Sequence, residues 1–450
     1  MSKWANEVGL LRRTINNLVL KKFSGVIDED VLQNLGLARG KITPTGFVGL
    51  LHDGVGPFSS LAESMFSQHP NVQRGTTLDS YQIQLLNILI SDYLDREAAS
   101  IDSGDVERIE LGLLSWFSIE AGSRTVFIPC VISPSRSSCF SIGPVSFLYR
   151  EDVQKSKYYP DAKNLGQFTN FEFESLLEMM RSNSASWLAV VDIIGCDNKR
   201  SLDIANLAVD ISLVALQVAA PYMDTRSMSR LADRRGPSTE MTLMLANGHY
   251  SAGRTNKEAG LSIGEGYLAE ILKTTAQTIT AVGNCVKSFV TGSFRLSHLE
   301  QAWCDAAYWL HQGLAEPLDS IAVTKLETSL EVLLSAGSTK NAKPSIIMAV
   351  GAFLGLGSGD TIVKSTGATV KMLARDISRD RSRVLHGDWS TLNVRLASSR
   401  KILEEISIIF IRESAVELDL YAREINAEDS AEEFLKWVKA RREQSVLNPS

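Results

Sequence analysis

Apolar residues recur at helical spacing throughout residues 291–450, and this pattern constrains the fold more than any other feature of the chain. The helices predicted there are Leu299 to Gly313, Ile321 to Leu334, Lys343 to Gly355, Thr361 to His386, Ser399 to Asn426 and Ala427 to Arg442. Ser297 stands where it can cap the first of them. Because amphipathic helices joined by short loops bury their apolar faces against one another, the sequence predicts an all-α helical bundle.

Residues 101–290 have a different pattern, with short apolar runs separated by glycine and proline. The predicted strands are Ile109 to Phe117, Thr125 to Ile132, Cys139 to Ile142, Val145 to Tyr149 and Ser186 to Cys196. A turn and a helix, Ser201 to Ala219, follow the last strand. Only Gly195 is present of the glycines that a phosphate-binding loop needs, so Asp197 is interpreted as a turn or cap residue. The fold class is therefore α+β: a mixed N-terminal region with a small antiparallel sheet, followed by the bundle.

Residues 1–100 are predicted to be mainly helical, with Thr77 to Tyr93 the clearest helix and Asp28 to Leu37 a short one. Gly40 to Gly46 is expected to be a loop. The first residues form an amphipathic helix whose apolar face carries Leu10, Leu11, Ile15, Leu18 and Val19. A membrane-surface helix is one interpretation, and a helix packed on its own domain is the preferred one. Three domains follow: 1–100 helical, 101–290 an α+β sensor or adaptor, and 291–450 the bundle.

Composition places the chain among ordinary soluble proteins, with 44% hydrophobic and 22% charged residues and a net charge of −6. The five cysteines show no metal-binding spacing and suit a reducing compartment, so we expect a cytoplasmic protein with no bound metal and no cofactor. No run of about 18 apolar residues is evident, and no membrane association is expected.

Two glycine-containing stretches have alternative interpretations. Met223 to Gly266 is either a partner-facing segment or a long surface connection, and the connection is preferred. Gly355 to Asp360 resembles a phosphate cradle in composition, but no Gly-Lys-Ser follows, so an interhelical loop is preferred.

The stretch Lys371 to Trp389 is rich in basic residues although the chain as a whole is acidic. Val370, Leu373, Ile377 and Val384 give its helix an apolar face. Its basic residues are Lys371, Arg375, Arg379, Arg381 and Arg383, with His386 and Gly387 at the end of the helix. Up to Lys401 the stretch holds eight lysines and arginines against three aspartates, which indicates a local anion-binding surface.

The string Arg381-Ser-Arg-Val-Leu-His386-Gly resembles the motif of the HEPN superfamily, an arginine followed four to six residues later by a histidine. It looks most like the Apea-like branch. Leu326 to Leu334, with a Leu-Glu pair before an apolar run, and His298 to Leu314, with its aromatic residues, resemble earlier helices of that domain. The resemblance covers the last third of the chain. It implies a helical domain that pairs into a homodimer, with the active cleft between two copies of the motif.

An RNA chain can be cut without metal, because its own 2′-hydroxyl is the nucleophile. A histidine with a pKa near 6.5 can move the required protons, and a guanidinium matches phosphate oxygens with a planar fork. The resemblance therefore implies that His386 is the general acid or base and Arg381 the phosphate clamp. Arg375, Arg379 and Arg383 are the candidate RNA-binding residues, and Ser382 and Glu331 the supporting ones.

Helical spacing alone leaves the choice of arginine open. Arg381 and His386 lie about 140° apart on a straight helix, whereas Arg379 and Arg383 lie near the face of His386. The alternative without catalysis is a solvated face on which Asp376 and Asp380 pair with Arg379 and Arg383. Glu331 either orients the arginine or histidine or is an ordinary surface acid.

The function expected from these residues and the resemblance is a metal-independent endoribonuclease, a toxin-like effector of bacterial anti-phage defence. The N-terminal region would respond to a regulatory partner or a phage-derived trigger. The alternative is a catalytically silent HEPN-like dimerisation module that binds RNA, nucleotide or a partner protein. A purely structural helical scaffold is the third hypothesis.

Overall fold

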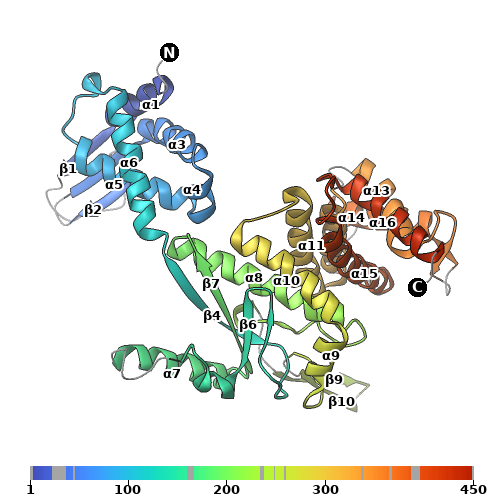
Figure 1. Ribbon diagram of the computed structural model, residues 1–450. Coiled ribbons are helices and arrows are strands. Elements are labelled where there is room, and N and C mark those ends of the chain that lie inside the picture. The colour runs from blue at the N-terminus through green and yellow to red at the C-terminus, as the bar shows by residue number, and fades with distance from the viewer. Residues whose placement is uncertain are drawn as a thin grey trace. The chain divides into compact units, whose positions relative to one another are not determined.

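The computed structural model describes residues 4–22, 37–43, 46–159, 167–233, 238–247, 249–257, 260–335, 339–363, 367–386 and 396–447 (Figure 1). The chain divides into two compact units. Unit 1 comprises Met1–Arg124 and Ile193–Asp203, and unit 2 comprises Thr125–Asp192 and Ile204–Ser450.

Unit 1 packs helices against a three-stranded antiparallel sheet of order β1-β3-β2. Its strands are β1 (Leu18–Lys22), β2 (Leu37–Thr43) and β3 (Gly46–Leu51). Its helices are α1 (Ala5–Ile15), α3 (His52–Ser67), α4 (Pro70–Gly75), α5 (Leu78–Tyr93), the short η1 (Ala98–Ser100) and α6 (Ser103–Glu120). Leu11, Leu50, Phe58, Leu61 and Leu85 are excluded from solvent at its centre. The interpretation of the first helix as one packed on its own domain is confirmed.

Unit 2 contains a five-stranded sheet of order β5-β6-β7-β4-β8. The strands are β4 (Ser123–Val131), β5 (Phe140–Ile142), β6 (Val145–Tyr149), β7 (Trp187–Ile194) and β8 (Ser229–Arg230), with the short η2 (Arg150–Lys155) and η3 (Leu231–Asp233) beside them. On one face Leu188 and Val190 of β7 pack with Phe173 and Leu177 of α7 (Gln167–Ser182). The alternate residues of β7 are equally buried, as expected of a strand covered on both faces.

Helix α8 (Asn198–Ala219) is buried on all sides from residue 208 to residue 218. It is long and apolar enough to cross a membrane, contrary to the expectation that no such run exists, but 72% of its most apolar 18-residue window is buried within the protein. Core helices of soluble proteins share this character, because a helix covered on every side is apolar on every side.

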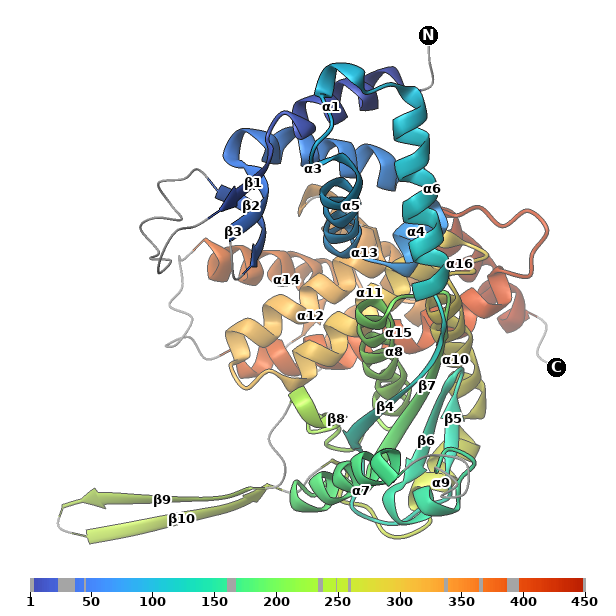
Figure 2. The same cartoon turned by 90° about the vertical axis from the view of Figure 1, so that its left-hand side faces the viewer.

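The rest of unit 2 is mainly a helical bundle (Figures 1 and 2). Its helices are α9 (Tyr267–Thr274), α10 (Ala276–Thr291), α11 (Ser297–Ala315), α12 (Asp319–Leu333), α13 (Thr339–Leu354), α14 (Val370–Leu385), α15 (Ala397–Tyr421) and α16 (Ala431–Leu447). Helix α15 packs against α10, α11, α12, α13 and α16. The indole nitrogen of Trp303 donates to the carbonyl of Ile411 at 3.0 Å, which joins α11 to α15. The α+β class, with small antiparallel sheets and a helical C-terminal region, is confirmed.

Several predicted elements are wrong in type. Ile109 to Phe117 is part of α6, whose start is fixed by a capping box between Asp102 and Asp105. Gly40 to Thr43 is not a loop but the end of β2, and Gly46 is the start of β3, whereas Pro44 and Thr45 lie outside the described residues. Gly40 and Gly49 pair across these strands, where any side chain would collide with the ring of Phe47. Residues 1–100 therefore contain a sheet that the apolar pattern did not predict.

Other corrections concern where helices begin and end. The first helix ends at Ile15, and Leu18 and Val19 belong to β1. Thr361 begins a small hairpin, β11 (Thr361–Val363) with β12 (Ala368–Thr369), and the motif helix begins only at Val370. The helical segment that begins at Tyr267 is divided at Thr275 into α9 and α10. The predicted helix Asp28 to Leu37 falls almost wholly outside the described residues.

The irregular stretch Met223 to Gly266 contains an antiparallel hairpin of β9 (Ser238–Ala246) and β10 (His249–Lys257), which forms a sheet of its own (Figure 2). The described side chains from Met241 to Arg254 are exposed. The expected surface position is thus confirmed for the hairpin, whereas Met228, Ser229 and Leu261 in the rest of the segment are buried.

Candidate functional site

Helix α14 carries the motif, and its inner face holds it in the bundle. The Thr369 hydroxyl accepts a hydrogen bond from the Met372 amide at 3.3 Å and caps the N-terminus. Val370, Leu373, Ala374 and Ile377 are buried, and α14 packs against α12 and α13. The predicted apolar face is confirmed in this half of the helix, and Val384 is half-buried.

The helix ends where the sequence predicted. His386 follows the last helical residue, and its amide donates to the Ser382 carbonyl at 2.9 Å. The imidazole is exposed and has no hydrogen-bond partner among the described residues. An exposed imidazole at a helix end can exchange protons with a bound substrate. Gly387 lies outside the described part of the chain.

Arginines occupy the side of α14 opposite the buried stripe. Arg375 and Arg379 are exposed, and Arg383 is half-buried. Asp376 accepts ion pairs from Arg375 at 3.2 Å and Arg379 at 3.3 Å, so the expected pair of Asp376 with Arg379 is confirmed. At 3.6 residues per turn these arginines and His386 fall on one side of the helix. Two of its cations are thus partly neutralised by one shared carboxylate.

Arg381 occupies a helical position in α14, and its side chain lies outside the described residues, as does that of Asp380. Five residues separate Arg381 from His386, which is about 140° around a straight helix. Arg381 and His386 therefore occupy different sides of the same helix. The described contacts do not bring the two together within one chain.

The supporting residues lie beside this helix. Ser382 is half-buried on α14, and Glu331 is half-buried on α12, which packs against α14. Glu327, one turn before Glu331, is only 1% exposed and was not singled out from the sequence. Both acids, like Arg379 and Arg383, take part in interactions within the chain. The signal for Glu327 was present, since both acids stand one turn apart in LETSLEVLL.

Fewer basic side chains of this stretch face solvent than its residue count suggested. Arg400 is 7% exposed and donates to Glu404 at 2.7 Å and Asp319 at 3.2 Å. It therefore braces α15 against the start of α12 rather than facing solvent. Arg395 lies outside the described residues.

A buried polar network that sequence reasoning missed lies between α8, β8 and α11. Asp210 accepts two hydrogen bonds from the Arg230 guanidinium, at 2.8 and 3.0 Å. His311 Nδ1 lies 3.1 Å from Gln217 Oε1, and its Nε2 lies 3.8 Å from Asp210. Asp210 and His311 are fully excluded from solvent, which argues for a structural role rather than substrate contact.

Other candidates have structural partners. Asp197 accepts from the Arg200 amide at 2.7 Å and from the Thr76 hydroxyl, so its interpretation as a cap is confirmed. His69 lies 2.9 Å from Glu110. Gly355–Asp360 is a loop in which the Asp360 carboxylate itself accepts the Gly357 amide at 2.7 Å, so that amide is not free for a phosphate. Among the described residues there is no group of three His, Cys, Asp or Glu side chains that could hold a metal ion.

Comparisons with protein-family models, curated proteins and solved structures find no match for this chain.

Proposed function

We propose that this protein is a metal-independent endoribonuclease of HEPN type, with His386 and Arg381 at its catalytic centre. The observation that carries the proposal is the end of α14, where an exposed imidazole follows a helix whose outer side carries Arg375, Arg379 and Arg383. This surface offers cations for a phosphodiester and a group that exchanges protons near neutral pH. It is also the segment in which the HEPN-like string occurs.

In the proposed mechanism the RNA 2′-hydroxyl attacks the adjacent phosphorus. His386 removes the hydroxyl proton or protonates the leaving 5′-oxygen, and a guanidinium stabilises the charge that develops on the phosphorane. The product is a 2′,3′-cyclic phosphate and a free 5′-hydroxyl. Each proton transfer needs a group in the correct state, and one imidazole can serve as base or as acid but not as both at once.

Pairing of two chains resolves this difficulty. Because Arg381 and His386 occupy different sides of α14, a homodimer that apposes two copies of the helix would supply two imidazoles and two sets of arginines to one groove. The remaining parts of the proposal follow the family resemblance. They are RNA as the partner, a cytoplasmic toxin-like role in anti-phage defence, and release of the nuclease by a regulatory or phage-derived trigger.

The direct test is a variant series with separate measurements of RNA cleavage and RNA binding. We expect His386→Ala and Arg381→Ala to lose cleavage by at least about 100-fold, the range that one general acid–base group supplies, while RNA binding falls much less. Arg375→Ala and Arg379→Ala should weaken binding and reduce its salt dependence. Lys439→Ala, an exposed cation on α16, is the matched control and should change neither quantity.

Full cleavage by His386→Ala would rule out the catalytic proposal. If wild type and variants bind RNA equally and none of them cuts it, in the purified state or on expression in cells, the silent HEPN-like module replaces the nuclease. The shared pairing of Arg375 and Arg379 with Asp376 is the observation that favours that second function, because it reduces the charge available to RNA.

A further inference from the structure

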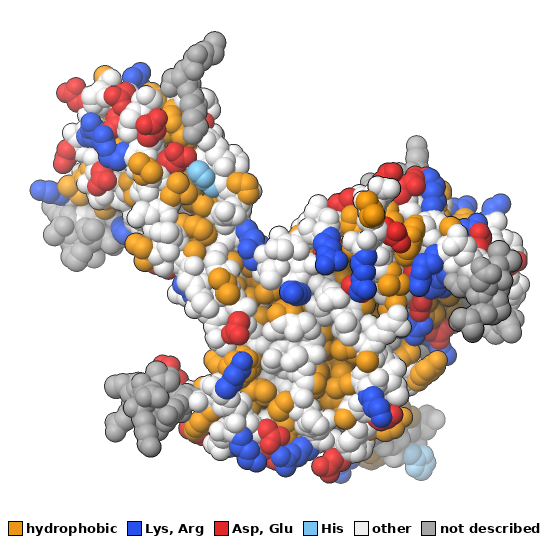
Figure 3. Space-filling view, viewed as in Figure 1, with side chains coloured by type: hydrophobic (Ala, Val, Ile, Leu, Met, Phe, Trp, Pro, Cys, Tyr) orange, Lys and Arg blue, Asp and Glu red, His pale blue; other side chains and the backbone are white. Residues whose placement is uncertain are grey.

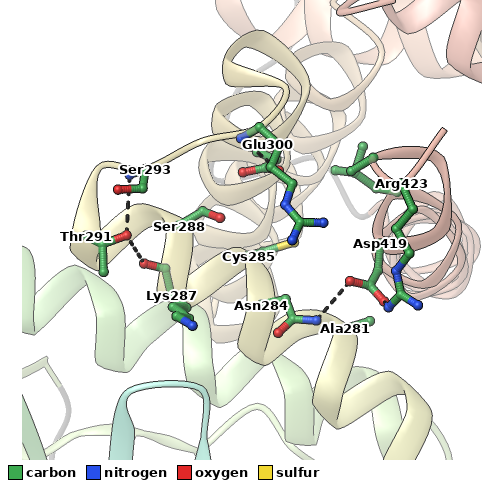
Figure 4. Close-up of a pocket in the computed structure, with 13 residues that line it drawn as sticks. Ala281, Asn284, Cys285, Lys287, Ser288, Thr291, Ser293, Glu300, Asp419 and Arg423 are labelled. Atoms are coloured by element: carbon green, nitrogen blue, oxygen red, sulfur yellow. Dashed lines mark hydrogen bonds and ion pairs between the residues drawn. The ribbon is translucent and has the colours of Figure 1, made fainter. Parts of the chain in front are cut away.

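A concave site lies in unit 2, away from the motif helix. It is a cavity of about 550 Å³ between α10, the connection to α11, and the C-terminal end of α15 (Figure 4). Its lining is mainly polar, and the residues that the argument uses are Asn284, Lys287, Arg295, Glu300, Asp419 and Arg423. A volume of this size is typical of sites for small molecules.

Glu300 gives the cavity an unsatisfied acceptor. It lies in the first turn of α11 and is only 6% exposed. Its Oε1 accepts the Arg295 amide at a long 3.4 Å, whereas its Oε2 is fully shielded and has no hydrogen-bond partner among the described residues. Leaving a carboxylate oxygen buried and unpaired is costly, and a ligand N–H group that donates to Oε1 would offset part of the cost of burying this carboxylate.

Cations stand at the mouth of the same cavity. Lys287 and Arg295 are exposed, and neither makes an ion pair within the described part of the chain. Arg423 pairs with Asp419, which also accepts the Asn284 amide at 2.9 Å (Figure 4). Lysine and arginine side chains are also visible over α10 and the neighbouring helices in Figure 3. Lys287 and Arg295 are thus available to an anionic group, whereas Asp419 is already satisfied.

Two other features of this region are excluded as the binding element. The N-terminus of α11 is occupied, because the Asp429 carboxylate accepts the amides of His298 and Leu299 at 2.8 and 2.9 Å. Burial raises the pKa of the Cys285 thiol, so it remains protonated and is a poor nucleophile. The cavity is therefore equipped to bind a ligand rather than to react with it.

We propose that this cavity binds a small molecule that carries both an anionic group and an N–H donor group. The anionic group lies against Lys287 and Arg295, and the donor group lies against the Glu300 carboxylate, whose Oε1 holds only the long hydrogen bond from the Arg295 amide. Nucleoside phosphates and amino acids share this chemistry. The proposal uses no residue of α14 and stands independently of the ribonuclease proposal.

The test is titration of the full-length protein with a defined panel, followed by thermal shift and calorimetry. The panel contains the four nucleoside 5′-monophosphates, arginine, glutamate and inorganic phosphate. We expect saturable binding of at least one nucleotide or amino acid, and the arm that binds identifies the source. The double change Lys287→Ala/Arg295→Ala and, separately, Glu300→Gln should each weaken it about tenfold or more. Lys273→Ala, an exposed cation on α9 outside the cavity, should bind as wild type does.

Three outcomes would overturn the proposal: no saturable binding by any probe, equal binding of phosphate alone as an adventitious ion, or binding that survives both sets of changes. Because Lys287 and Arg295 are exposed, the double variant is expected to fold even if Glu300→Gln does not. RNA cleavage measured on the same variants keeps the two proposals separate, since loss of the ligand site leaves His386 and Arg381 intact.

Discussion

Asp429 stabilises a helix that begins 132 residues before it in the chain. The sequence predicted that Ser297 caps α11, but Ser297 is the first helical residue and Leu296 before it has no side chain that can accept a hydrogen bond. Asp429, in the connection between α15 and α16, supplies the carboxylate instead. It also places negative charge at the positive end of the helix dipole.

We therefore expect Asp429→Ala to lower the free energy of unfolding by about 1 kcal/mol, the usual cost of losing a helix cap. Asp429→Asn keeps an acceptor oxygen and should lose less. Urea unfolding followed by circular dichroism measures both. An unchanged midpoint for Asp429→Ala would show that the contact contributes nothing to stability.

The cysteines differ in exposure, and this makes their reactivity predictable. Cys139 is exposed, whereas Cys130, Cys196, Cys285 and Cys304 are buried. Burial raises the thiol pKa of Cys196, Cys285 and Cys304. One thiol should therefore react rapidly with a disulfide reagent at pH 8 in the native protein, and all five after denaturation. Rapid reaction of several thiols in the native state would contradict the buried positions.

The same buried thiols should make the free energy of unfolding decrease at high pH. In the unfolded chain they ionise near a pKa of about 8.5, whereas in the folded protein they keep their protons. Their contribution is therefore fully present below that pH, and the free energy of unfolding should fall as pH rises above about 9.

At the scale of elements, the pairing of Asp210 with Arg230 connects α8 to the short edge strand β8. The carboxylate is fully buried, and the guanidinium donates to both of its oxygens. Removing one member of a buried pair leaves an uncompensated charge, which is more damaging than the pair itself is stabilising.

Arg230→Met should thus destabilise the fold by about 3–5 kcal/mol, as measured by urea unfolding. Arg226→Met is the matched control. Arg226 stands in the same connection and pairs with Glu404 at 2.8 Å, but its side chain is 53% exposed, so the expected loss is about 1 kcal/mol or less. Equal losses for the two variants would mean that burial of Asp210 is not what makes its ion pair important.

Elements with strong local signals could be predicted from the sequence. Helix α5 begins one residue after its predicted start, because Thr77 accepts the Ser80 amide and caps the helix. Strands β4, β6 and β7 lie within two residues of their predicted ends. The failures had two causes, a tertiary contact in one case and a misleading local pattern in the other. The strands around Gly40 depend on the pairing of Gly40 with Gly49. Helix α6 starts at the capping box of Asp102 with Asp105, but the apolar run that follows has a pattern typical of a strand.

In the candidate site, some features follow from local helical spacing and others depend on contacts between distant residues. The buried stripe of α14, its end at Leu385 and the pairing of Arg379 with Asp376 follow from helical spacing within one segment. The burial of Arg400 could not be predicted, since one of its partners, Asp319, lies 81 residues away. The contact of His311 with Gln217, 94 residues apart, had no sequence signal either.

At the scale of the whole molecule, the proposed ribonuclease mechanism requires a homodimer. Because the positions of Arg381 and His386 lie on different sides of α14, the proposed mechanism draws the two groups at one phosphate from two chains. Light scattering on the purified protein should give twice the mass of one chain at micromolar concentration. A strictly monomeric protein that nevertheless cuts RNA would contradict this arrangement.

The most direct measurement of the central claim is the chemistry of the cut, made on RNA incubated with wild-type protein in EDTA. Attack by the RNA 2′-hydroxyl should leave 2′,3′-cyclic phosphate or 3′-phosphate ends. A single 2′-deoxy substitution at the cut site should abolish cleavage there. Cleavage that needs a divalent cation, or that leaves 3′-hydroxyl ends, would contradict the proposed mechanism. Neither result is compatible with metal-independent attack by the RNA 2′-hydroxyl assisted by His386.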